Sequence, residues 1–293
     1  MARSFLFVPG DSERKLDKAL GGGAAGADAI ILDLEDSVAE PSKLAARRQI
    51  AARLAGRAPG VAPELWVRIN GLESAHAAED LAALAGALPD GVLLPKCRSL
   101  EDVRELGRRL DAIDAAGATA IMATVTETPE GALRVAEYRS GAPRLTAITW
   151  GAEDLSAALN VASARDAAGA WLPLFEQLRS VVRVAAAAAG IHAIDTVYTD
   201  IANVDGLRAY VASSRRLGFS GMLAIHPAQV PTINEGFRPT AAELELARRV
   251  VAAFDNSGGA GVIRFEGSML DLPHLRQARA LLAAAGQAPK VAR

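Results

Sequence analysis

Several charged side chains follow short apolar segments of the sequence, at points where parallel β-strands would end. Glu127 comes just after the apolar run Ala120–Val125, and Asp154 comes shortly after Leu145–Trp150. Carboxylates that lie close together repel one another and raise one another's pKa values. A hard divalent cation that binds their oxygens would remove this repulsion. The pattern therefore predicts a Mg²⁺ site with Glu127 and Asp154 as its ligands. The sequence has no cluster of histidines or pair of cysteines that would indicate zinc.

Arg68 lies near the end of another apolar run, Leu65–Ile69. An arginine in such a position needs an anionic partner, because an unpaired buried charge is costly. Asp33 or Glu35 could pair with it within the fold. The alternative is a substrate carboxylate that the guanidinium holds through two parallel hydrogen bonds. We expect Arg68 to bind a small acid. Whether it pairs with Asp33 or with Glu35 within the fold is left open by the sequence.

Other charged residues follow neighbouring apolar runs and are expected around the metal ligands rather than on the metal. They are Asp33, Glu35, Asp36 and Lys96. An acidic residue in such a loop often only caps the helix that follows it. This simpler interpretation applies to Asp36 and also to Glu127, which precedes Thr128-Pro129-Glu130.

The elements that would position these residues alternate regularly along the chain. Eight apolar runs predict strands at Phe5–Val8, Ala29–Leu34, Leu65–Ile69, Val92–Leu94, Ala120–Val125, Leu145–Trp150, Ala193–Val197 and Met222–Ile225. Segments with helical spacing separate them, at Glu13–Leu20, Lys43–Leu54, Ala77–Leu88, Leu100–Ala116, Gly131–Tyr138, Phe175–Ala189 and Asp205–Leu217. Short strands that alternate with helices indicate parallel pairing.

Eight such units in a chain of 293 residues favour a (β/α)8 TIM barrel. An open doubly wound sheet is the alternative, but a glycine fingerprint for a dinucleotide is missing. The barrel places the active site at the carboxyl ends of the strands, where the charged residues fall. We expect a barrel catalytic domain over residues 1–238 and a C-terminal helical extension, acting as a lid, over 239–293.

Composition limits the possible partners. The net charge is −2, the pI is about 6.1 and no long basic run occurs, so neither nucleic acid nor an anionic membrane is expected as a partner. A single cysteine, Cys97, excludes a disulfide framework. No apolar stretch reaches the ~20 residues of a membrane span, and the N-terminus does not resemble a signal peptide. We therefore expect a cytoplasmic protein.

The motifs that carry these residues resemble a known family. The stretches are RSFLFVPGDSERKLDKAL, ADAIILDLEDSV, WVRING, GVLLPK, ETPEGAL, WGAEDLSAALN, AIDTVYTDI, LGFSGMLAIHPAQVPTIN and GSMLDLPH. In this order and spacing they resemble the citrate lyase β-subunit-like (CitE-like) branch of the HpcH/HpaI aldolase family, which includes malyl-CoA and citramalyl-CoA lyases. The resemblance runs from Arg3 to about His274.

The resemblance implies roles for individual residues. Glu127 and Asp154 match the family's magnesium ligands, and Arg68 matches the residue that binds the substrate carboxylate. Asp271 matches an aspartate that reaches a neighbouring subunit's site and transfers a proton. Arg14 and Lys18, in the segment after the first strand, are candidates for contact with CoA. The family usually forms trimers or hexamers, so a homo-oligomer, with a homotrimer as the first choice, is expected.

The activity that the resemblance implies is that of a carbon–carbon lyase. Its substrate would be a 3-hydroxyacyl-CoA such as malyl-CoA or citramalyl-CoA, and its products acetyl-CoA and a small 2-oxoacid. One alternative is a citrate lyase β subunit that acts on an acyl-carrier-protein thioester. A second is a malyl-CoA thioesterase, and a third is a catalytically silent barrel.

Overall fold

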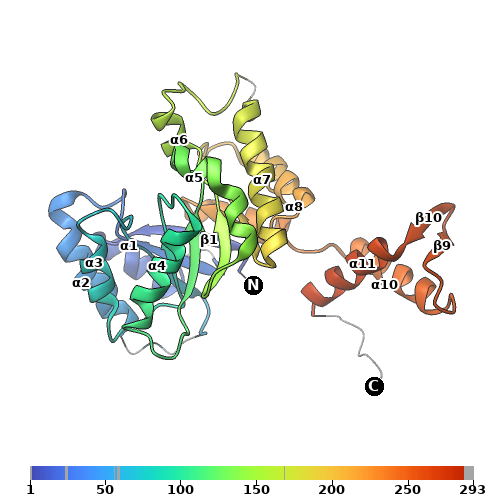
Figure 1. Ribbon diagram of the computed structural model, residues 1–293, viewed down its shortest axis with the longest axis horizontal. Coiled ribbons are helices and arrows are strands. Elements are labelled where there is room, and N and C mark those ends of the chain that lie inside the picture. The colour runs from blue at the N-terminus through green and yellow to red at the C-terminus, as the bar shows by residue number, and fades with distance from the viewer. Residues whose placement is uncertain (1, 24–25, 56, 58–59, 168, 287–293) are drawn as a thin grey trace. The chain divides into compact units, whose positions relative to one another are not determined.

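The structure is a computed structural model that describes residues 2–23, 26–55, 57, 60–167 and 169–286. Two compact units divide the chain, Met1–Phe237 and Arg238–Arg293. The division falls one residue from the boundary that the sequence suggested. Figure 1 shows the two units, each of which has a hydrophobic core of its own.

The first unit is a closed barrel of eight parallel strands in which each strand pairs with the next and β8 pairs with β1. The strands are β1 (Ser4–Pro9), β2 (Ala29–Asp33), β3 (Glu64–Arg68), β4 (Gly91–Leu94), β5 (Ala120–Thr124), β6 (Leu145–Thr149), β7 (His192–Asp195) and β8 (Gly221–Ala224). All eight expected strands are present, and the (β/α)8 barrel predicted from the sequence is confirmed.

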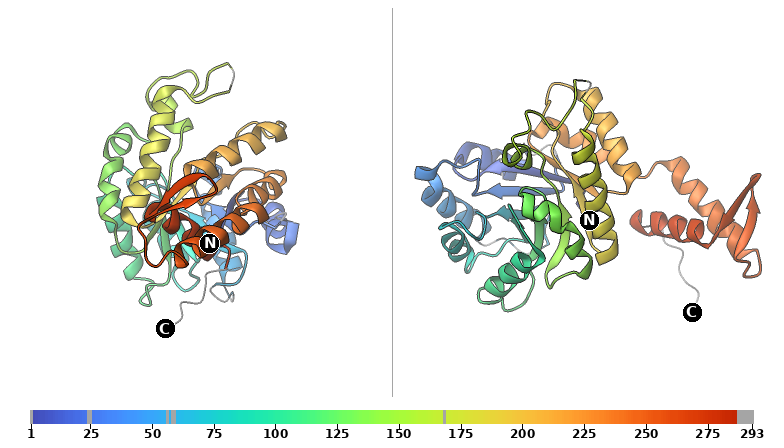
Figure 2. Two further views of the ribbon diagram at one scale, coloured as in Figure 1. Left: turned by 90° about the vertical axis from the view of Figure 1, so that its right-hand side faces the viewer. Right: turned by 45° about the horizontal axis from the view of Figure 1, so that its top comes forward.

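Helices connect the strands and cover the outside of the barrel (Figure 2). They are α1 (Glu13–Lys18), α2 (Lys43–Leu54), α3 (Ala77–Leu84), α4 (Leu100–Asp111), α5 (Pro129–Arg134), α6 (Glu153–Ala158), α7 (Pro173–Ala189), α8 (Val204–Leu217) and α9 (Val230–Gly236). Short turns of other helical types are η1 (Ala19–Gly23), η2 (Glu40–Ser42), η3 (Val135–Ser140) and η4 (Pro227–Gln229). The expected helix Gly131–Tyr138 divides into α5 and η3, and the sequence analysis did not predict α6.

Alternation along the strands sorts their side chains into two cores. One cluster contains a buried residue from every strand, including Phe5, Ile31, Trp66 and Met122, and therefore fills the inside of the barrel. Intervening residues such as Ile30 pack outward with the helices. A Cβ atom on Gly91 would lie 2.4 Å from the Trp66 ring, so glycine there makes room for the indole.

The same alternation determines where charged side chains enter the barrel. Asp33 follows Ile31 by two positions, and Arg68 follows Trp66 by two positions. Both therefore point inward, one layer nearer the carboxyl ends of the strands than the apolar filling. The hydrophobic interior thus ends in a polar layer at the rim where a barrel of this type binds its ligands.

The second unit contains α10 (Ala241–Asp255), β9 (Val262–Phe265), β10 (Ser268–Asp271) and α11 (Leu272–Ala284). Its own small core includes Val250, Phe254 and Leu282. The antiparallel β9–β10 hairpin between the two helices was not predicted. Its turn has positive φ at Glu266 (48°) and Gly267 (84°), the backbone typical of a two-residue hairpin turn. Its two strands are largely exposed and so lack the continuous apolar run by which the barrel strands were predicted.

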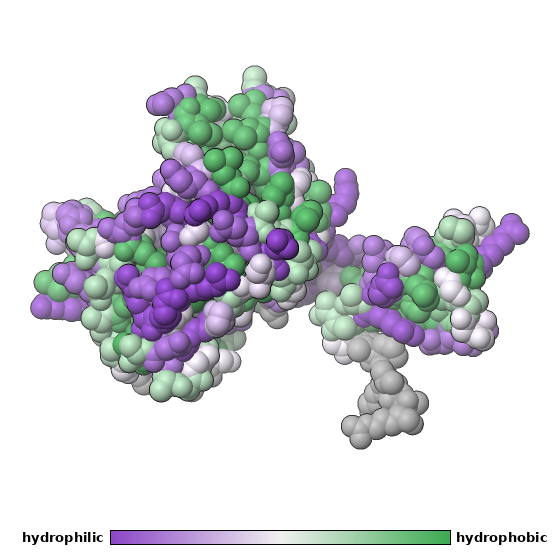
Figure 3. Space-filling model, viewed as in Figure 1, coloured by the Kyte–Doolittle hydropathy of each residue, from purple (hydrophilic) through white to green (hydrophobic). Residues whose placement is uncertain are grey.

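The surface of the first unit carries an apolar area over α6 and the beginning of α7 (Figure 3). Leu159 and Leu174 are 38% and 44% exposed there. Across the part of the chain that the structure describes, no helix has both the length and the apolar character needed to cross a membrane.

Candidate metal and acid-binding site

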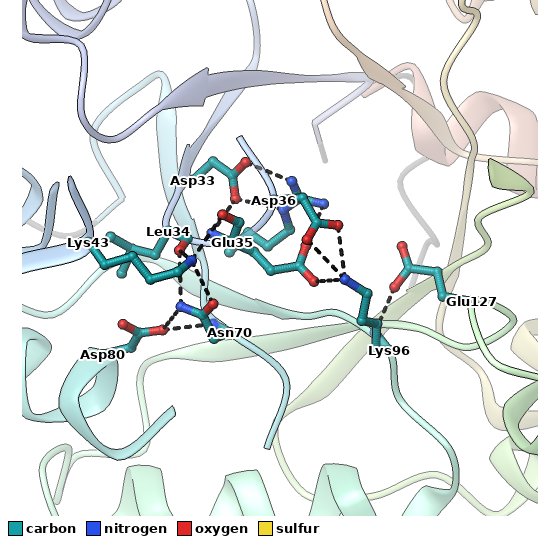
Figure 4. A network of polar contacts seen from close by, with 10 residues as sticks. Asp33, Leu34, Glu35, Asp36, Lys43, Asn70, Asp80, Lys96 and Glu127 are labelled. Carbon is teal, nitrogen blue, oxygen red and sulfur yellow. Dashed lines mark hydrogen bonds and ion pairs between the residues drawn. The ribbon is translucent and has the colours of Figure 1, made fainter. Parts of the chain in front are cut away.

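The site forms where the strands β2 to β6 end. Asp33 and Arg68 are the last residues of β2 and β3, and Lys96 follows β4. Glu127 follows β5, and Asp154 lies in the first turn of α6, after β6. Figure 4 shows Asp33, Glu35, Lys96 and Glu127 around the same space.

Arg68 is held by both of the internal partners that the sequence left open. Its Nε and Nη2 donate to the two carboxylate oxygens of Asp33 at 2.7 and 2.6 Å, and its Nη1 lies 3.0 Å from Oε2 of Glu35. Burial alone would raise the pKa of Asp33, but the hydrogen bonds and charge of Arg68 outweigh it and hold that pKa below its usual value. A guanidinium has five N–H donors and the hydrogen bonds to Asp33 use two of them, so others remain available for a ligand.

Glu127 is oriented by the backbone rather than serving as a helix cap. Its Oε2 accepts a hydrogen bond from the Lys96 N–H at 2.6 Å. Thr128 is the residue that caps α5, because its hydroxyl accepts from the Gly131 N–H at 3.0 Å. The capping interpretation of Glu127 is therefore wrong, and its carboxylate is free for another role.

Burial raises the pKa of Glu127 to about 8, and the charge of Glu35 adds to the effect. The hydrogen bond from Lys96 and the charge of Arg68 act in the opposite direction but do not cancel it. The charge of Asp154 also contributes to the increase, which places the two expected metal ligands within electrostatic range of each other.

Gly151 gives Glu127 the space that it occupies. A Cβ atom on Gly151 would lie 2.8 Å from Cγ and 3.0 Å from Oε1 of Glu127. Contacts this short do not occur in folded proteins, so any larger residue would displace the carboxylate. Gly151 lies in the β6–α6 loop, shortly before Asp154 in the first turn of α6.

Lys96 connects three acidic residues. Its Nζ donates to Oε1 of Glu35 at 2.5 Å and to the two oxygens of Asp36 at 2.9 and 3.0 Å, while its backbone N–H donates to Glu127. Asp36 therefore pairs with Lys96 and does not cap a helix. Burial lowers the pKa of Lys96, but the hydrogen bonds to the two carboxylates reverse this and leave it raised. The backbone of Lys96 has a φ of 50°, a left-handed conformation that is strained for a residue with a side chain and is often found at functional sites.

The charges at this rim fit a divalent cation. Two cations, Arg68 and Lys96, face a larger group of carboxylates: Asp33, Glu35, Asp36, Glu127 and Asp154. Bound Mg²⁺ would relieve the excess of negative charge, and it usually takes one or two protein carboxylates and fills its other positions with water and substrate. Within the described ranges, no group of three or more His, Cys, Asp or Glu side chains is placed to hold a metal ion.

A cavity of about 340 Å³ lies beside these residues. Its walls include Glu35, Asp36, Asn70, Lys96 and Arg98. Cys97 also borders it but is 1% exposed, and burial raises the pKa of its thiol to about 12, which is unfavourable for a nucleophile.

Three of the expected site residues are not part of this cluster. Arg14 and Lys18 are exposed on one side of α1, and a role in CoA binding stays a prediction. Asp271 belongs to the second unit, where it precedes α11 and its Oδ1 lies 2.6 Å from Nδ1 of His274. Its role in proton transfer likewise stays a prediction.

The structure also shows a buried residue that the sequence analysis did not identify. Lys43 reaches from the beginning of α2 to the loop that carries Glu35, where it meets Asn70 (Figure 4). A signal was present in the sequence, because a lysine in the first turn of a helix opposes the helix dipole.

Fold and site together define a parallel (β/α)8 barrel with an acidic rim suited to a hard cation and an anionic ligand. The chain belongs to the HpcH/HpaI aldolase/citrate lyase family, whose model matches residues 3–227. This confirms the family expected from the sequence motifs.

Known relatives match almost the whole chain. A citrate lyase subunit β-like protein of Mycobacterium tuberculosis is 40% identical over 285 residues, which cover 97% of this chain and 96% of that protein. A (3S)-malyl-CoA thioesterase of Cereibacter sphaeroides is 38% identical over a match that covers 97% of this chain and 94% of that protein. The structure of CitE from M. tuberculosis with magnesium, acetoacetate and coenzyme A has a TM-score of 0.80 at 37% identity, covering 97% of this chain and 98% of the other. The magnesium in that relative agrees with the cofactor expected from the sequence.

Proposed function

We propose that the protein is a Mg²⁺-dependent carbon–carbon lyase that cleaves, or forms, a 3-hydroxyacyl-CoA. The observation that supports this most strongly is that Arg68 at the end of β3, Glu127 after β5 and Asp154 after β6 lie at one barrel rim. The structural relative that binds magnesium, acetoacetate and coenzyme A supports the same ligand classes.

In this proposal Glu127 and Asp154 hold Mg²⁺ and Arg68 binds the carboxylate of the substrate. Bound Mg²⁺ would polarise a carbonyl oxygen and stabilise negative charge on it. Asp33 and Glu35 fix the guanidinium of Arg68 in advance, so its remaining N–H groups are already oriented when the acid arrives. Such prior orientation strengthens interactions with charge that develops during the reaction.

The proposed cleavage breaks the bond between C2 and C3 of malyl-CoA or citramalyl-CoA. The 3-hydroxyl gives its proton to a general base and becomes the carbonyl of a 2-oxoacid, glyoxylate or pyruvate. The bonding electron pair passes to C2 as the enolate of acetyl-CoA, which then takes a proton. We propose that Asp271 of a neighbouring subunit supplies this proton, and that the C-terminal unit acts as a lid that screens the site from water.

The product mixture tests the proposal. Purified protein with Mg²⁺ should convert malyl-CoA or citramalyl-CoA to acetyl-CoA and the 2-oxoacid, and EDTA should stop the reaction. Arg68→Ala and Asp154→Ala should each reduce turnover by on the order of 10²–10³ or more. Arg53→Ala is the control, since Arg53 lies on α2 and pairs with Asp17 away from the rim. Full activity in either site variant would contradict the proposal.

A thioesterase is the second candidate, because one relative carries the name (3S)-malyl-CoA thioesterase. Hydrolysis would give free malate and CoA instead of glyoxylate and acetyl-CoA, so the same assay separates the two activities. A third candidate, a citrate lyase β subunit, would act on a carrier-protein thioester and leave free CoA esters uncleaved.

We also propose that the chain forms a homo-oligomer, with a trimer as the first expectation and a hexamer as the alternative. Exposed apolar area of the kind found over α6 and α7 is typical of surfaces that contact another protein. Light scattering during size-exclusion chromatography should give a multiple of 30.4 kDa. Leu159→Asp should lower that mass, and a monomeric wild-type protein would contradict the proposal.

A further inference from the structure

Lys43 is a buried cation whose ammonium group donates hydrogen bonds to uncharged oxygens. It is 8% exposed, and its Nζ donates to the carbonyl oxygens of Leu34 and Glu35 at 2.9 and 3.2 Å. The third donor goes to Oδ1 of Asn70 at 2.9 Å. All three ammonium N–H groups are therefore used, which makes Lys43 a rigid connection rather than a mobile surface charge.

Neither helix stability nor an ion pair accounts for this lysine. Lys43 begins α2, where a positive charge opposes the helix dipole. No ion pair with a carboxylate within 4.0 Å is found for it among the residues that the structure describes. Burying a charge without an opposite charge in contact is unfavourable, so the fold retains Lys43 at an energetic disadvantage.

The hydrogen bonds of Lys43 join the loop after β2 to the loop after β3, the strand that ends at Arg68. Leu34 and Glu35 follow β2, whereas Asn70 follows β3. Asn70 reinforces the connection, because its Nδ2 donates to the Leu34 carbonyl at 3.0 Å and to Asp80 at 2.7 Å. Asp80 is in turn held by Arg47 on α2, whose Nε donates to Oδ1 of Asp80 at 2.7 Å.

This connection fixes the backbone of Glu35, and Glu35 is the residue that contacts both rim cations. Its Oε2 lies 3.0 Å from Nη1 of Arg68 and its Oε1 accepts from Lys96 at 2.5 Å. Oε2 is buried and accepts no hydrogen bond of good geometry within the described residues. The carboxylate is thus held at its tip by two cations, and where its backbone lies decides how it meets Arg68 and Lys96.

From this arrangement we infer that Lys43 is a positioning residue for the acid-binding site. It holds the Glu35 backbone so that the Glu35 carboxylate keeps Arg68 oriented for an incoming 2-oxoacid. The inference rests on the proposed function, because it assumes that Arg68 binds such an acid. The bonds of Lys43 go to the loops after β2 and β3 and none goes to Glu127 or Asp154, so we expect a larger effect on affinity for the acid than on affinity for the metal.

Lys43→Met tests this inference, because methionine fills a similar volume without donors or charge. Calorimetry with Mg²⁺ and pyruvate or glyoxylate should show a Kd for the acid raised by about ten-fold or more, while the Kd for Mg²⁺ changes by less than about three-fold. Lys43→Arg retains cationic donors and should recover part of the loss. Arg53→Met, on the same helix, should leave both constants unchanged.

The outcomes separate this inference from the proposed function. If the wild-type protein binds no 2-oxoacid, the proposed function and this inference both fail. If wild-type binding is normal and folded Lys43→Met binds the acid equally well, only the inference fails. Equal losses for acid and Mg²⁺ would show a general structural role and overturn it too. Should Lys43→Met not fold, Asn70→Ala removes one side of the same connection and should show the same selective loss of acid affinity.

Discussion

Replacing Glu127 by glutamine should make the metal-free protein more stable above pH 5. Burial and neighbouring negative charge raise the pKa of Glu127 to about 8 from its ordinary value of 4.5. A carboxyl group whose pKa is raised by folding stabilises the fold fully below its unfolded pKa. That contribution disappears as the pH rises through the folded pKa. The wild-type protein should therefore lose stability relative to Glu127→Gln between about pH 4.5 and 8.

The size of the effect follows from the two pKa values. At pH 7 the Glu127 carboxyl is mostly protonated in the folded protein but ionised in the unfolded chain. The linkage relation then gives a free energy of unfolding about 3 kcal/mol lower than it would be with a carboxyl that stays protonated. This is an upper value, because Glu127 is only partly buried at the rim and water screens its charge. The glutamine side chain of the variant would keep an oxygen that accepts the Lys96 N–H bond, so the comparison isolates the ionisation of the carboxyl group.

Urea unfolding in EDTA between pH 5 and 9 measures this difference. The two proteins should converge near pH 5 and diverge with increasing pH, and the divergence should stop above about pH 8. Saturating Mg²⁺ should stabilise the wild-type protein but not the variant, because binding to the folded state adds stability. Glu130→Gln, on the exposed part of α5, controls for the loss of a negative charge from this segment. A constant difference at all pH values would show that folding does not perturb the ionisation of Glu127.

Three further substitutions test other parts of the site. Gly151→Ala should weaken Mg²⁺ binding about 10- to 100-fold in calorimetry, because the added Cβ would displace Glu127. Thermal stability should change little, and an unchanged affinity for Mg²⁺ would contradict that contact. Arg68→Lys should reduce kcat/KM by about 10²-fold or more although the charge is retained, because lysine cannot reproduce the paired hydrogen bonds to Asp33 and to the substrate. A near-normal rate would argue against Arg68 as the residue that binds the substrate carboxylate. Asp271→Ala should abolish lyase turnover while calorimetry still detects Mg²⁺ and 2-oxoacid binding at the barrel; retained turnover would remove Asp271 from the mechanism.

The sequence by itself determined the barrel and the set of residues at its rim. Buried parallel strands need continuous apolar segments, and polar residues directly after such segments must lie at one end of a closed barrel. Glu127, Arg68 and Asp154 could therefore be selected from local pattern. The strands of the β9–β10 hairpin were missed because they are largely exposed and lack the continuous apolar run of a buried strand. Helix α6 was missed because it buries Leu155 alone, which leaves no helical apolar spacing to detect.

Only the tertiary structure decided how these residues interact. Arg68 could have paired with Asp33, with Glu35 or with neither, and the fold pairs it with both. Lys43 becomes part of the site through bonds to Asn70, which lies on a loop distant in sequence. Such contacts depend on the closure of the barrel and on the register between neighbouring strands. Side-chain distances across strands are set by packing of the whole chain, whereas strand and helix periodicity is set by the residues within each segment.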